Sequence, residues 1–371
     1  MPPTPGSCGP RGWCSGRWRV PGWRNDVERP EDLVEEVARI RGYEHIPAYL
    51  PASSGSLTPE PAWVEVERRI RGALSGAGFD EVVNYSFVDP GVLPWVTPRA
   101  LEKLGTPVGA VALKNPLTPQ QAVMRTTLLA SLLGNVAFNL RHQPDSLRLY
   151  EIGRSYLRDP HGGKDRRPVA EERLHVSGVL WGKREVAFPD AKGAVEAIVS
   201  ALSAGELTCR LARVAPFHPR ATAEARVGDV VLGWIGELHP LVAQHLELPP
   251  GVFAFELELA ALGKVAQLSP QFRSIPRYPA VLRDLAVVVP AAMEAAEVRA
   301  VILEVGLPLV ENAALFDVYT GAPLPEGQKN LAFALTYRSP ERTLRDEEVQ
   351  EAHRRIVDEV QRRLGGQLRG R

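Results

Sequence analysis

The amino-acid sequence predicts an α+β protein in which a mainly antiparallel domain is followed by a smaller domain of the ferredoxin-like type. Between about residues 60 and 260, amphipathic helical segments are interspersed with short apolar runs bounded by glycine and proline. The last hundred residues follow the order strand, helix, strand, strand, helix, strand, which is the split arrangement of ferredoxin-like domains. The chain has 371 residues, 44% of them hydrophobic and 24% charged. These values are typical of globular proteins with two or three domains and exclude disorder as the main state.

Composition also excludes several classes of protein. The longest apolar run, Leu285 to Met293, is far shorter than the ~18 residues of a membrane-spanning helix, so we expect no membrane segment. Cys8, Cys14 and Cys209 form neither a disulfide framework nor a common zinc pattern, which favours a cytoplasmic location. With 44 basic and 44 acidic side chains, bulk electrostatic binding of nucleic acid is excluded, and any RNA contact must be local.

The first 47 residues divide into a lead and a helix. Residues 1–18 are rich in proline and glycine, contain no acid and lack the apolar run of a secretory signal, so they predict a disordered lead before a truncated domain or an artefactual start. From Glu31 to Arg41, the spacing of Leu33, Val37 and Ile40 predicts a helix with one apolar side. We expect residues 19–47, which contain this helix, to be the remnant of the truncated domain, and a Pro/Ser-rich linker to follow them.

A core domain is predicted at residues 60–262. Its apolar periodicity and its glycine and proline punctuation separate helices from strands. The expected helices lie near 63–76, 126–141, 191–203 and 240–246. The expected strands lie near 80–88, 147–157, 174–181, 207–214, 223–227, 230–236 and 253–259.

A second domain is predicted at residues 274–371. Its expected elements are strand 284–289, helix 294–306, strands 313–319 and 330–338, helix 346–364 and a short terminal strand. In a βαββαβ unit both helices cover one face of the sheet. The other face is therefore expected to be open for binding.

Four acids near the first helix are candidate metal ligands. At about 100° per residue, Asp32, Glu35 and Glu36 fall on the side of the helix opposite its apolar residues, and Asp26 precedes the helix. Converging carboxylates suit Mg²⁺. Acidic first turns are common because they suit the helix dipole, so spacing alone favours an ordinary solvated helix start.

Other signatures of catalysis are weak. His218-Pro219 and His239-Pro240 lie beside predicted strands, without a nucleophile elbow or a further histidine at metal spacing, which favours turn roles. Neither a phosphate loop of the G-x-x-x-x-G-K-[ST] type nor a strand followed by G-x-G-x-x-G occurs. A self-contained P-loop or Rossmann enzyme is excluded.

Aromatic and basic residues are interleaved in the terminal domain. Such side chains on an open sheet suit stacking on unpaired bases and pairing with phosphates. The set comprises Arg277, Tyr278, Arg283, Tyr319, Lys329, Tyr337, Arg338 and Arg342. Because basic and acidic residues balance in this domain, ordinary surface ion pairs are the alternative.

Three groups of motifs, taken together, resemble the family of bacterial phenylalanyl-tRNA synthetase beta subunits. The run from Trp23 to Tyr43 resembles the end of that family's B5 domain. Four segments resemble that family's synthetase-like core: Asn115-Pro116-Leu117, Met124-Arg125-Thr126, Tyr150-Glu151-Ile152-Gly153-Arg154 and Gly236-Glu237-Leu238-His239-Pro240. Three further segments, 276–286, 315–319 and 338–344, resemble the family's ferredoxin-fold anticodon-binding domain.

This resemblance implies specific roles. Asp26, Asp32, Glu35 and Glu36 fall on the family's magnesium ligands, and the core takes the antiparallel class II synthetase fold without the residues that form the adenylate. ATP is then bound by a catalytic alpha subunit in an alpha2beta2 heterotetramer. On the open sheet, Tyr278 and Tyr319 are expected as stacking surfaces for bases, and Arg283 and Arg338 as partners of phosphates or base edges. Because neighbours in a strand point to opposite faces and the sequence does not fix the register, the alternative is that one residue of each pair lies in the core.

The sequence departs from the family in two ways. The family's oligonucleotide-binding and editing domains and most of B5 do not match here, and the segment Phe217 to Ala221 lacks a glycine usual after its proline. The leading hypothesis is an N-terminally truncated, non-catalytic subunit of phenylalanine-tRNA ligase that supports charging of tRNA by its alpha partner. A stand-alone RNA-binding paralogue and a non-functional fragment are the alternatives.

Overall fold

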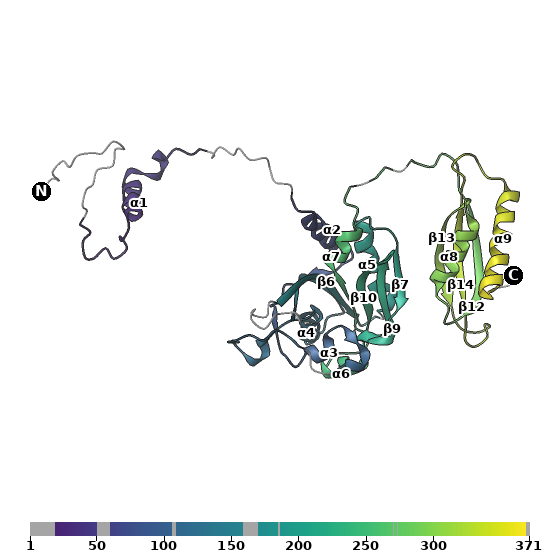
Figure 1. Cartoon of the computed structure of the whole chain (residues 1–371), viewed down its shortest axis with the longest axis horizontal. Helices are drawn as coiled ribbons and strands as arrows, with labels where there is room; N and C mark the ends of the chain where they lie inside the picture. The colour runs from purple at the N-terminus through teal and green to yellow at the C-terminus, as the bar shows by residue number, and fades with distance from the viewer. Residues whose placement is uncertain are drawn as a thin grey trace, which may run out of the picture. The chain divides into compact units, whose positions relative to one another are not determined.

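A computed structural model describes residues 19–49, 60–105, 109–158, 170–184, 186–269, 271–272 and 274–368. The predicted lead at 1–18 lies outside the described residues. The chain divides into two units, residues 1–59 and 60–371, and the second contains both the core domain and the terminal domain (Figure 1). In the described part of the chain, no helix is long and apolar enough to cross a membrane.

The first helix, α1, spans Pro30–Arg41, which confirms the helix predicted there. Asp32 Oδ2 accepts hydrogen bonds from the backbone N–H groups of Glu28 (2.8 Å) and Arg29 (2.7 Å), so this side chain satisfies free donors at the helix start. The helix ends at Gly42, whose φ of 95° favours glycine, and the short helix η1 follows at Tyr43–His45. No residue of α1 is buried.

The core domain is built on a seven-stranded sheet with the order β1-β5-β6-β11-β10-β9-β7. All neighbouring strands are antiparallel except β1 and β5. The strands are β1 (Asp80–Glu81), β5 (Ser146–Arg158), β6 (Ala170–Gly182), β7 (Leu207–Leu211), β9 (Phe217–Val227), β10 (Val230–Leu238) and β11 (Phe253–Glu258). Short strands β2 (Phe87–Val88), β3 (Arg99–Ala100), β4 (Val123–Met124) and β8 (Val214–Ala215) pair in twos outside this sheet.

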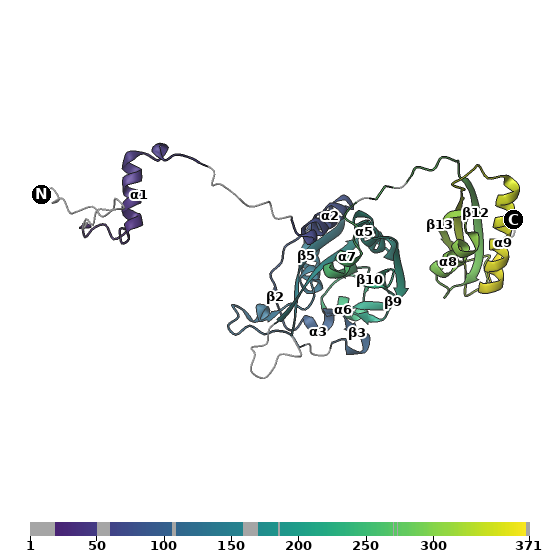
Figure 2. The ribbon, with the colours of Figure 1, turned by 45° about the horizontal axis from the view of Figure 1, so that its top comes forward.

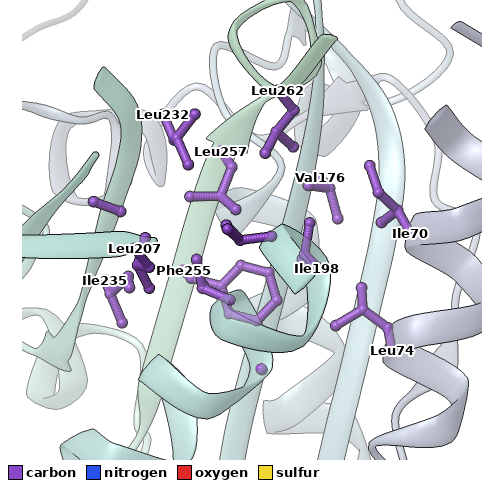
Figure 3. Packing of buried hydrophobic residues seen from close by; sticks show 14 of the residues in the cluster. Ile70, Leu74, Val176, Ile198, Leu207, Leu232, Ile235, Phe255, Leu257 and Leu262 are labelled. Carbon is purple, nitrogen blue, oxygen red and sulfur yellow. The ribbon is translucent and has the colours of Figure 1, made fainter. Parts of the chain in front are cut away.

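Helices cover both faces of the core sheet (Figures 1 and 2). One layer contains α2 (Ala62–Gly76), α5 (Phe188–Ala201) and α7 (Leu259–Val265), and the other contains α3 (Leu93–Val96), α4 (Leu129–Leu140) and α6 (Pro240–His245). Under the first layer, Leu74, Ile198 and Phe255 are fully buried (Figure 3). Burying each such side chain contributes about 1.5–3 kcal/mol, so the two apolar layers hold the domain together.

Three details of the core differ from the prediction. The strand expected at 80–88 is paired only at its two ends, because side-chain contacts hold the segment between β1 and β2. Helix α4 begins at Leu129 rather than Thr126, since the buried Glu256 carboxylate accepts hydrogen bonds from Leu128 N and Thr127 Oγ1. The short helices α3 and α7 were not expected, because one or two turns carry too little periodicity to be recognised.

The terminal domain has the predicted βαββαβ order. Its elements are β12 (Val281–Pro290), α8 (Ala295–Gly306), β13 (Val310–Tyr319), β14 (Gln328–Tyr337), α9 (Asp346–Leu364) and β15 (Gln367–Leu368). The sheet order is β13-β14-β12-β15. Both helices pack on one face, over a core that includes Phe333, Leu335 and Ile356, and the ferredoxin-like prediction is confirmed.

Candidate functional site

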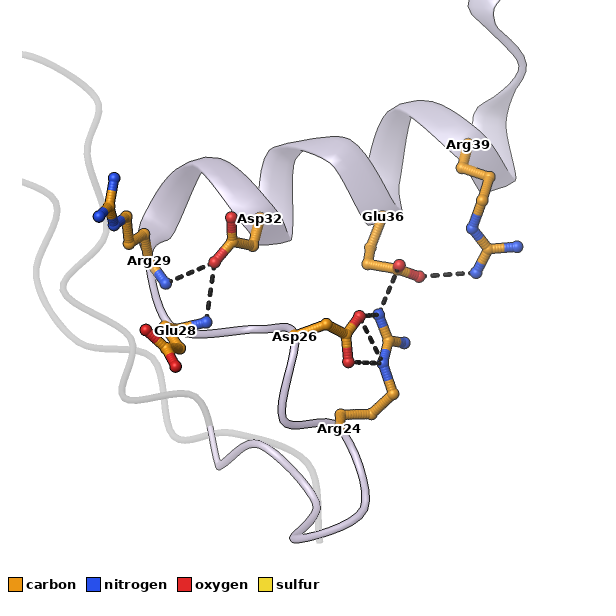
Figure 4. Close-up of polar contacts among 7 residues, drawn as sticks. All are labelled: Arg24, Asp26, Glu28, Arg29, Asp32, Glu36 and Arg39. Atoms are coloured by element: carbon orange, nitrogen blue, oxygen red, sulfur yellow. Dashed lines mark hydrogen bonds and ion pairs between the residues drawn. The ribbon is translucent and has the colours of Figure 1, made fainter. Parts of the chain in front are cut away.

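The acidic residues around α1 are joined by arginines (Figure 4). The Arg24 guanidinium lies between two carboxylates, with Nη2 at 2.7 Å from Asp26 Oδ2 and 2.6 Å from Glu36 Oε1. Arg39 Nη2 is 2.6 Å from the second oxygen of Glu36. Asp32 belongs to the helix start, where it accepts backbone N–H groups, and not to this cluster.

Hydrogen bonds from Arg24, and then from Arg39, lower the pKa of Glu36 to about 2. Arg24 likewise lowers the pKa of Asp26. Both carboxylates are therefore ionised, but their oxygens point at guanidinium groups. Among the residues that the structure describes, no group of three or more His, Cys, Asp or Glu side chains is placed to hold a metal ion. Asp26, Asp32, Glu35 and Glu36 thus fit a magnesium ion poorly in this arrangement, and their ligand role stays a prediction.

Strand register fixes which side chains occupy the open face of the terminal sheet. Leu331, Phe333 and Leu335 of β14 lie in the core under the helices, so the residues between them face the other way. The rows across β13, β14 and β12 on this open face are Tyr319–Asn330–Val288, Asp317–Ala332–Ala286, Ala314–Ala334–Asp284 and Asn312–Thr336–Leu282. None of these paired positions is lysine or arginine, in contrast to the basic open face that the sequence suggested.

The four candidate tRNA-contacting residues fall in three places. Arg283 pairs with Leu335 in the register and therefore lies on the helix side, where its Nη2 is 3.1 Å from Asp346 Oδ1 of α9, so of the two faces that the sequence left open it takes the one away from the open surface. Arg338 follows β14 and donates from Nη1 to the carbonyl oxygen of Tyr278 (3.0 Å), which brings these two residues together. Tyr319 alone lies within the open face, at the opposite end of β13.

Sequence reasoning missed Asn330, the neighbour of Tyr319 on β14. Its side chain is 3% exposed, and its Oδ1 has no hydrogen-bond partner among the described residues. A buried amide oxygen without a partner costs about 1–3 kcal/mol, which makes it a candidate ligand contact. The only signal in the sequence was an asparagine directly before the apolar run of the strand, and asparagine is disfavoured in strands.

The core domain contains a buried polar network. Arg125 Nη1 is 2.7 Å from Glu151 Oε1, with both side chains 3% exposed. Asn84 Nδ2 donates to the second Glu151 oxygen at 2.9 Å. The network is enclosed by protein and anchors the segment between β1 and β2, so its role in this fold is structural.

The anchored segment presents an apolar strip to solvent. Alternate residues Val83, Tyr85 and Phe87 are 90%, 76% and 40% exposed. Asn84, between the first two, points inward to Glu151. Three neighbouring exposed apolar side chains, on a backbone that Asn84 fixes to Glu151, are typical of a surface that another protein covers.

The two His-Pro motifs lie together, with the rings of His218 and His239 at a centroid distance of 6.1 Å. Each Nδ1 accepts the backbone N–H two residues further on, from Arg220 and Leu241, both at 3.2 Å. Burial, and then the proximity of His218, lowers the pKa of His239. These local hydrogen bonds agree with the predicted turn roles.

Comparison with protein families gives three matches in chain order. Residues 15–43 match the tRNA synthetase B5 domain, residues 46–259 match the phenylalanyl tRNA synthetase beta chain CLM domain, and residues 276–369 match the ferredoxin-fold anticodon binding domain. Among solved structures, the pyrrolysyl tRNA synthetase PylSc of Desulfitobacterium hafniense gives a TM-score of 0.43 at 17% identity, covering 66% of this chain and 80% of that one. That likeness is too slight to carry an argument.

Curated relatives agree with the family models. The phenylalanine--tRNA ligase beta subunit of Anaeromyxobacter dehalogenans is 47% identical over 368 residues, covering 95% of this chain and 44% of the relative. That of Moorella thermoacetica is 41% identical, covering 94% of this chain and 44% of the relative. The chain thus spans less than half the length of these relatives. Since one family model alone matches more than half of it, the chain belongs to the phenylalanyl-tRNA synthetase beta chain family.

Proposed function

We propose that this chain supports the ATP-dependent attachment of phenylalanine to its tRNA by a catalytic alpha subunit, and that its terminal domain contacts the tRNA. The observation that carries the proposal is the open sheet face of a domain that matches the anticodon-binding family. The chain itself supplies no adenylate chemistry in this proposal. ATP is bound by the alpha subunit, and pyrophosphate exchange with ATP and phenylalanine by the pure chain would contradict that division.

The Tyr319 and Asn330 pair gives the tRNA contact its chemistry. The Tyr319 hydroxyl donates to the Ala322 carbonyl, which holds the ring at the sheet surface, where the residue is 37% exposed. The Asn330 Oδ1 beside this ring is buried and has no partner among the described residues, so a movement of the ring that admits a base lets the base amino group donate to it. Tyr319 then provides affinity for any base, and Asn330 favours bases that carry a donor.

The apolar strip Val83, Tyr85 and Phe87 supports a protein partner. A contiguous group of exposed apolar side chains marks a protein interaction surface, and a beta subunit functions with another chain. We place the alpha subunit on this strip, in an alpha2beta2 heterotetramer. Tyr85→Ser should weaken co-purification with the alpha subunit, whereas Phe138→Ser, at an exposed position on α4, should not.

The acidic residues around α1 raise a separate question, whether they hold magnesium or only ion pairs. The arginine pairs around Asp26 and Glu36 favour the ion-paired interpretation of the acidic face over a metal site. Metal analysis of the purified chain, before and after replacing Glu35 and Glu36 with glutamine, separates the two. Unchanged metal content supports the ion-paired interpretation, and loss of bound Mg²⁺ restores the ligand assignment. The cytoplasmic location stays a prediction.

The tRNA contact is tested by titrating the full chain with a phenylalanine tRNA anticodon stem-loop. Tyr319→Ala should weaken binding by about 1–3 kcal/mol, roughly 5-fold to 150-fold, because one stacked base is lost. Tyr337→Phe is the matched control, since Tyr337 is fully buried on the helix side of the sheet. Equal losses in both variants would mean that the open face does not select the RNA.

The alternatives differ in what they require. A stand-alone RNA-binding paralogue binds the stem-loop but no alpha subunit, and a non-functional fragment binds neither. Co-expression with an alpha subunit, followed by aminoacylation of phenylalanine tRNA, distinguishes both from the proposed subunit.

A further inference from the structure

A cleft of about 380 Å³ lies at one end of the terminal sheet. It is formed where β12 and β13 begin and β14 ends, and the segment that precedes β12 forms its other side. Charged residues Arg277, Arg338 and Glu311 share its lining with Pro276, Pro308 and Pro340. We call it the Arg277–Arg338 cleft.

The charges in this cleft are not balanced. Arg338 Nε donates to Glu311 Oε2 at 2.7 Å, so these two side chains form an ion pair, and the contact with the Tyr278 carbonyl fixes the guanidinium further. Arg277 makes no hydrogen bond or ion pair with the described residues. The cleft therefore offers one cation for an external anion, beside a second guanidinium that is held in place.

The walls of the cleft suit a planar ring. Three prolines present apolar faces and no backbone N–H, and their rings lose little conformational entropy when a ligand packs on them. The volume is ample for one nucleobase with its sugar. An apolar wall beside an unpaired arginine matches a nucleotide, whose base and phosphate need these two environments.

The cleft continues the open face of the sheet. Arg338 comes two residues after Thr336, which lies on that face, and its backbone N–H still bonds to the Leu309 carbonyl at 2.8 Å. Along β13 the cleft is roughly 25 Å from Tyr319, at about 3.3 Å per residue. Single-strand binding modules cover about 4–16 nucleotides, so one strand can reach both ends.

The surface between the two ends offers small side chains to bases and, among its described residues, no cation to phosphates. The two middle rows of the open face carry Ala314, Ala334, Ala286 and Ala332. Their remaining members, Asp284 and Asp317, are acids that cannot pair with phosphate. Any pairing with phosphate must therefore take place at the end of the sheet that carries Arg277 and Arg338.

We propose that the Arg277–Arg338 cleft is a nucleotide-binding site, in which Arg277 pairs with a phosphate of an RNA strand whose bases contact Tyr319 at the other end of the sheet. The proposal rests on the tRNA contact proposed above and adds a second, basic end to it. It also explains how a face without lysine or arginine can hold an anionic ligand.

The test is the salt dependence of stem-loop binding to the full chain. Each phosphate contact on a single strand contributes about 0.7 to the slope of log K against log salt concentration. Arg277→Ala should lower the slope by about that amount, and Arg277→Lys should restore it, because lysine keeps the charge. Arg283→Ala is the matched control, since Arg283 is ion-paired on the helix side and should leave the slope unchanged.

The outcomes separate this inference from the proposed function. Stem-loop binding with equal slopes for the wild-type chain and Arg277→Ala overturns the cleft and leaves the tRNA contact intact. Failure of the wild-type chain to bind at all overturns the tRNA contact itself. Inorganic phosphate at millimolar concentration should compete only weakly, because it lacks the base. Full competition by phosphate would make the cleft a free-anion site instead.

Discussion

Helix α1 in residues 19–49 and helix α9 in the terminal domain share local sequence features and have different surroundings. In each, the third residue is an acid, Asp32 or Glu348, that accepts the backbone N–H of the residue before the helix, at 2.7 Å and 2.9 Å. Each helix carries apolar residues at helical spacing. In α9 these include Ile356, which is packed in the core and is 0% exposed to solvent. Ile40 of α1, in contrast, is 76% exposed.

The comparison teaches which property of a helix is local. Capping groups and apolar spacing lie within one helix length, so they specify where a helix begins and which side is apolar. Whether that side is buried depends on a second element. The strands of the terminal sheet supply it for α9, and the described residues of the first unit supply none for α1.

The largest expected effect comes from removing one buried side chain of α9. Ile356→Ala should lower the free energy of unfolding of the terminal domain by about 2–5 kcal/mol, because a buried isoleucine is replaced by a cavity. Ile40→Ala, the matched change on α1, should alter stability by less than about 0.5 kcal/mol. Urea unfolding, with hydrogen exchange at the amides of β12 and β14, measures both. Similar losses in the two variants would show that α1 is covered in solution.

A smaller effect is expected where α9 ends. Gly365 has φ 65°, and no atom lies within 4 Å of a Cβ added there, so Gly365→Ala meets strain in the backbone alone. The cost should be about 1–2 kcal/mol in the same unfolding experiment. Gly72→Ala inside α2, where a Cβ is equally unobstructed, should instead stabilise by about 0.5–1 kcal/mol. If both substitutions stabilise, the end of α9 is not fixed by this glycine.

The stability of the terminal domain should fall as the pH is lowered through about 6.5. Burial first, and then the nearby Arg283, lowers the pKa of His353, whose Nδ1 is 2.9 Å from the Tyr337 hydroxyl. Below about pH 6.5 the unfolded chain therefore binds more protons than the folded one, and stability falls as pH falls. Urea midpoints between pH 7.5 and 5.5 measure this. His353→Gln should flatten the dependence, and an equally steep variant would assign it to another group.

The smallest effect is expected at α1, and at lower pH. Because Glu36 has its pKa lowered to about 2, its contribution is complete above the ordinary value of about 4.3 and is lost as pH falls toward 2. Arg24→Gln should return the pKa of Glu36 toward that ordinary value, since Arg24 is the main cause of the shift. An NMR titration of the side-chain carboxyl measures it. An unshifted titration curve in the variant would show that Arg24 does not bind Glu36 in solution.

Most elements of the fold could be predicted, because their signals are local. Helix α9 matches its predicted bounds of 346–364, where an acidic first turn, apolar periodicity and a terminal glycine coincide. The segment 80–88 was mistaken for one strand, because its alternation of apolar residues is real but its middle is held by the side chain of Glu151, distant in sequence, instead of by backbone pairing.

The candidate site was predicted less well than the fold. Tyr319 and Arg283 were both candidates for the open face, but the sequence did not fix the register that puts only Tyr319 there, and a shift of one residue in register is enough to reverse a side chain. Asn330 was missed because its significance lies in an unpaired oxygen beside Tyr319, and neither burial nor that neighbour is visible in sequence. From the sequence, Arg24 was recognised only as part of a family motif. Its position between the carboxylates of Asp26 and Glu36 is visible only in the structure.

By itself, the sequence determined the order of elements, the apolar side of each long helix and the family of the chain, since these depend on periodicity and on motifs of a few residues. The tertiary structure decided the register of β12, β13 and β14, the encounter of Asn84 with Glu151, and the gathering of Arg277 and Arg338 at one cleft. These contacts join residues far apart in the chain. Their geometry follows from how whole elements pack, and no local pattern encodes it.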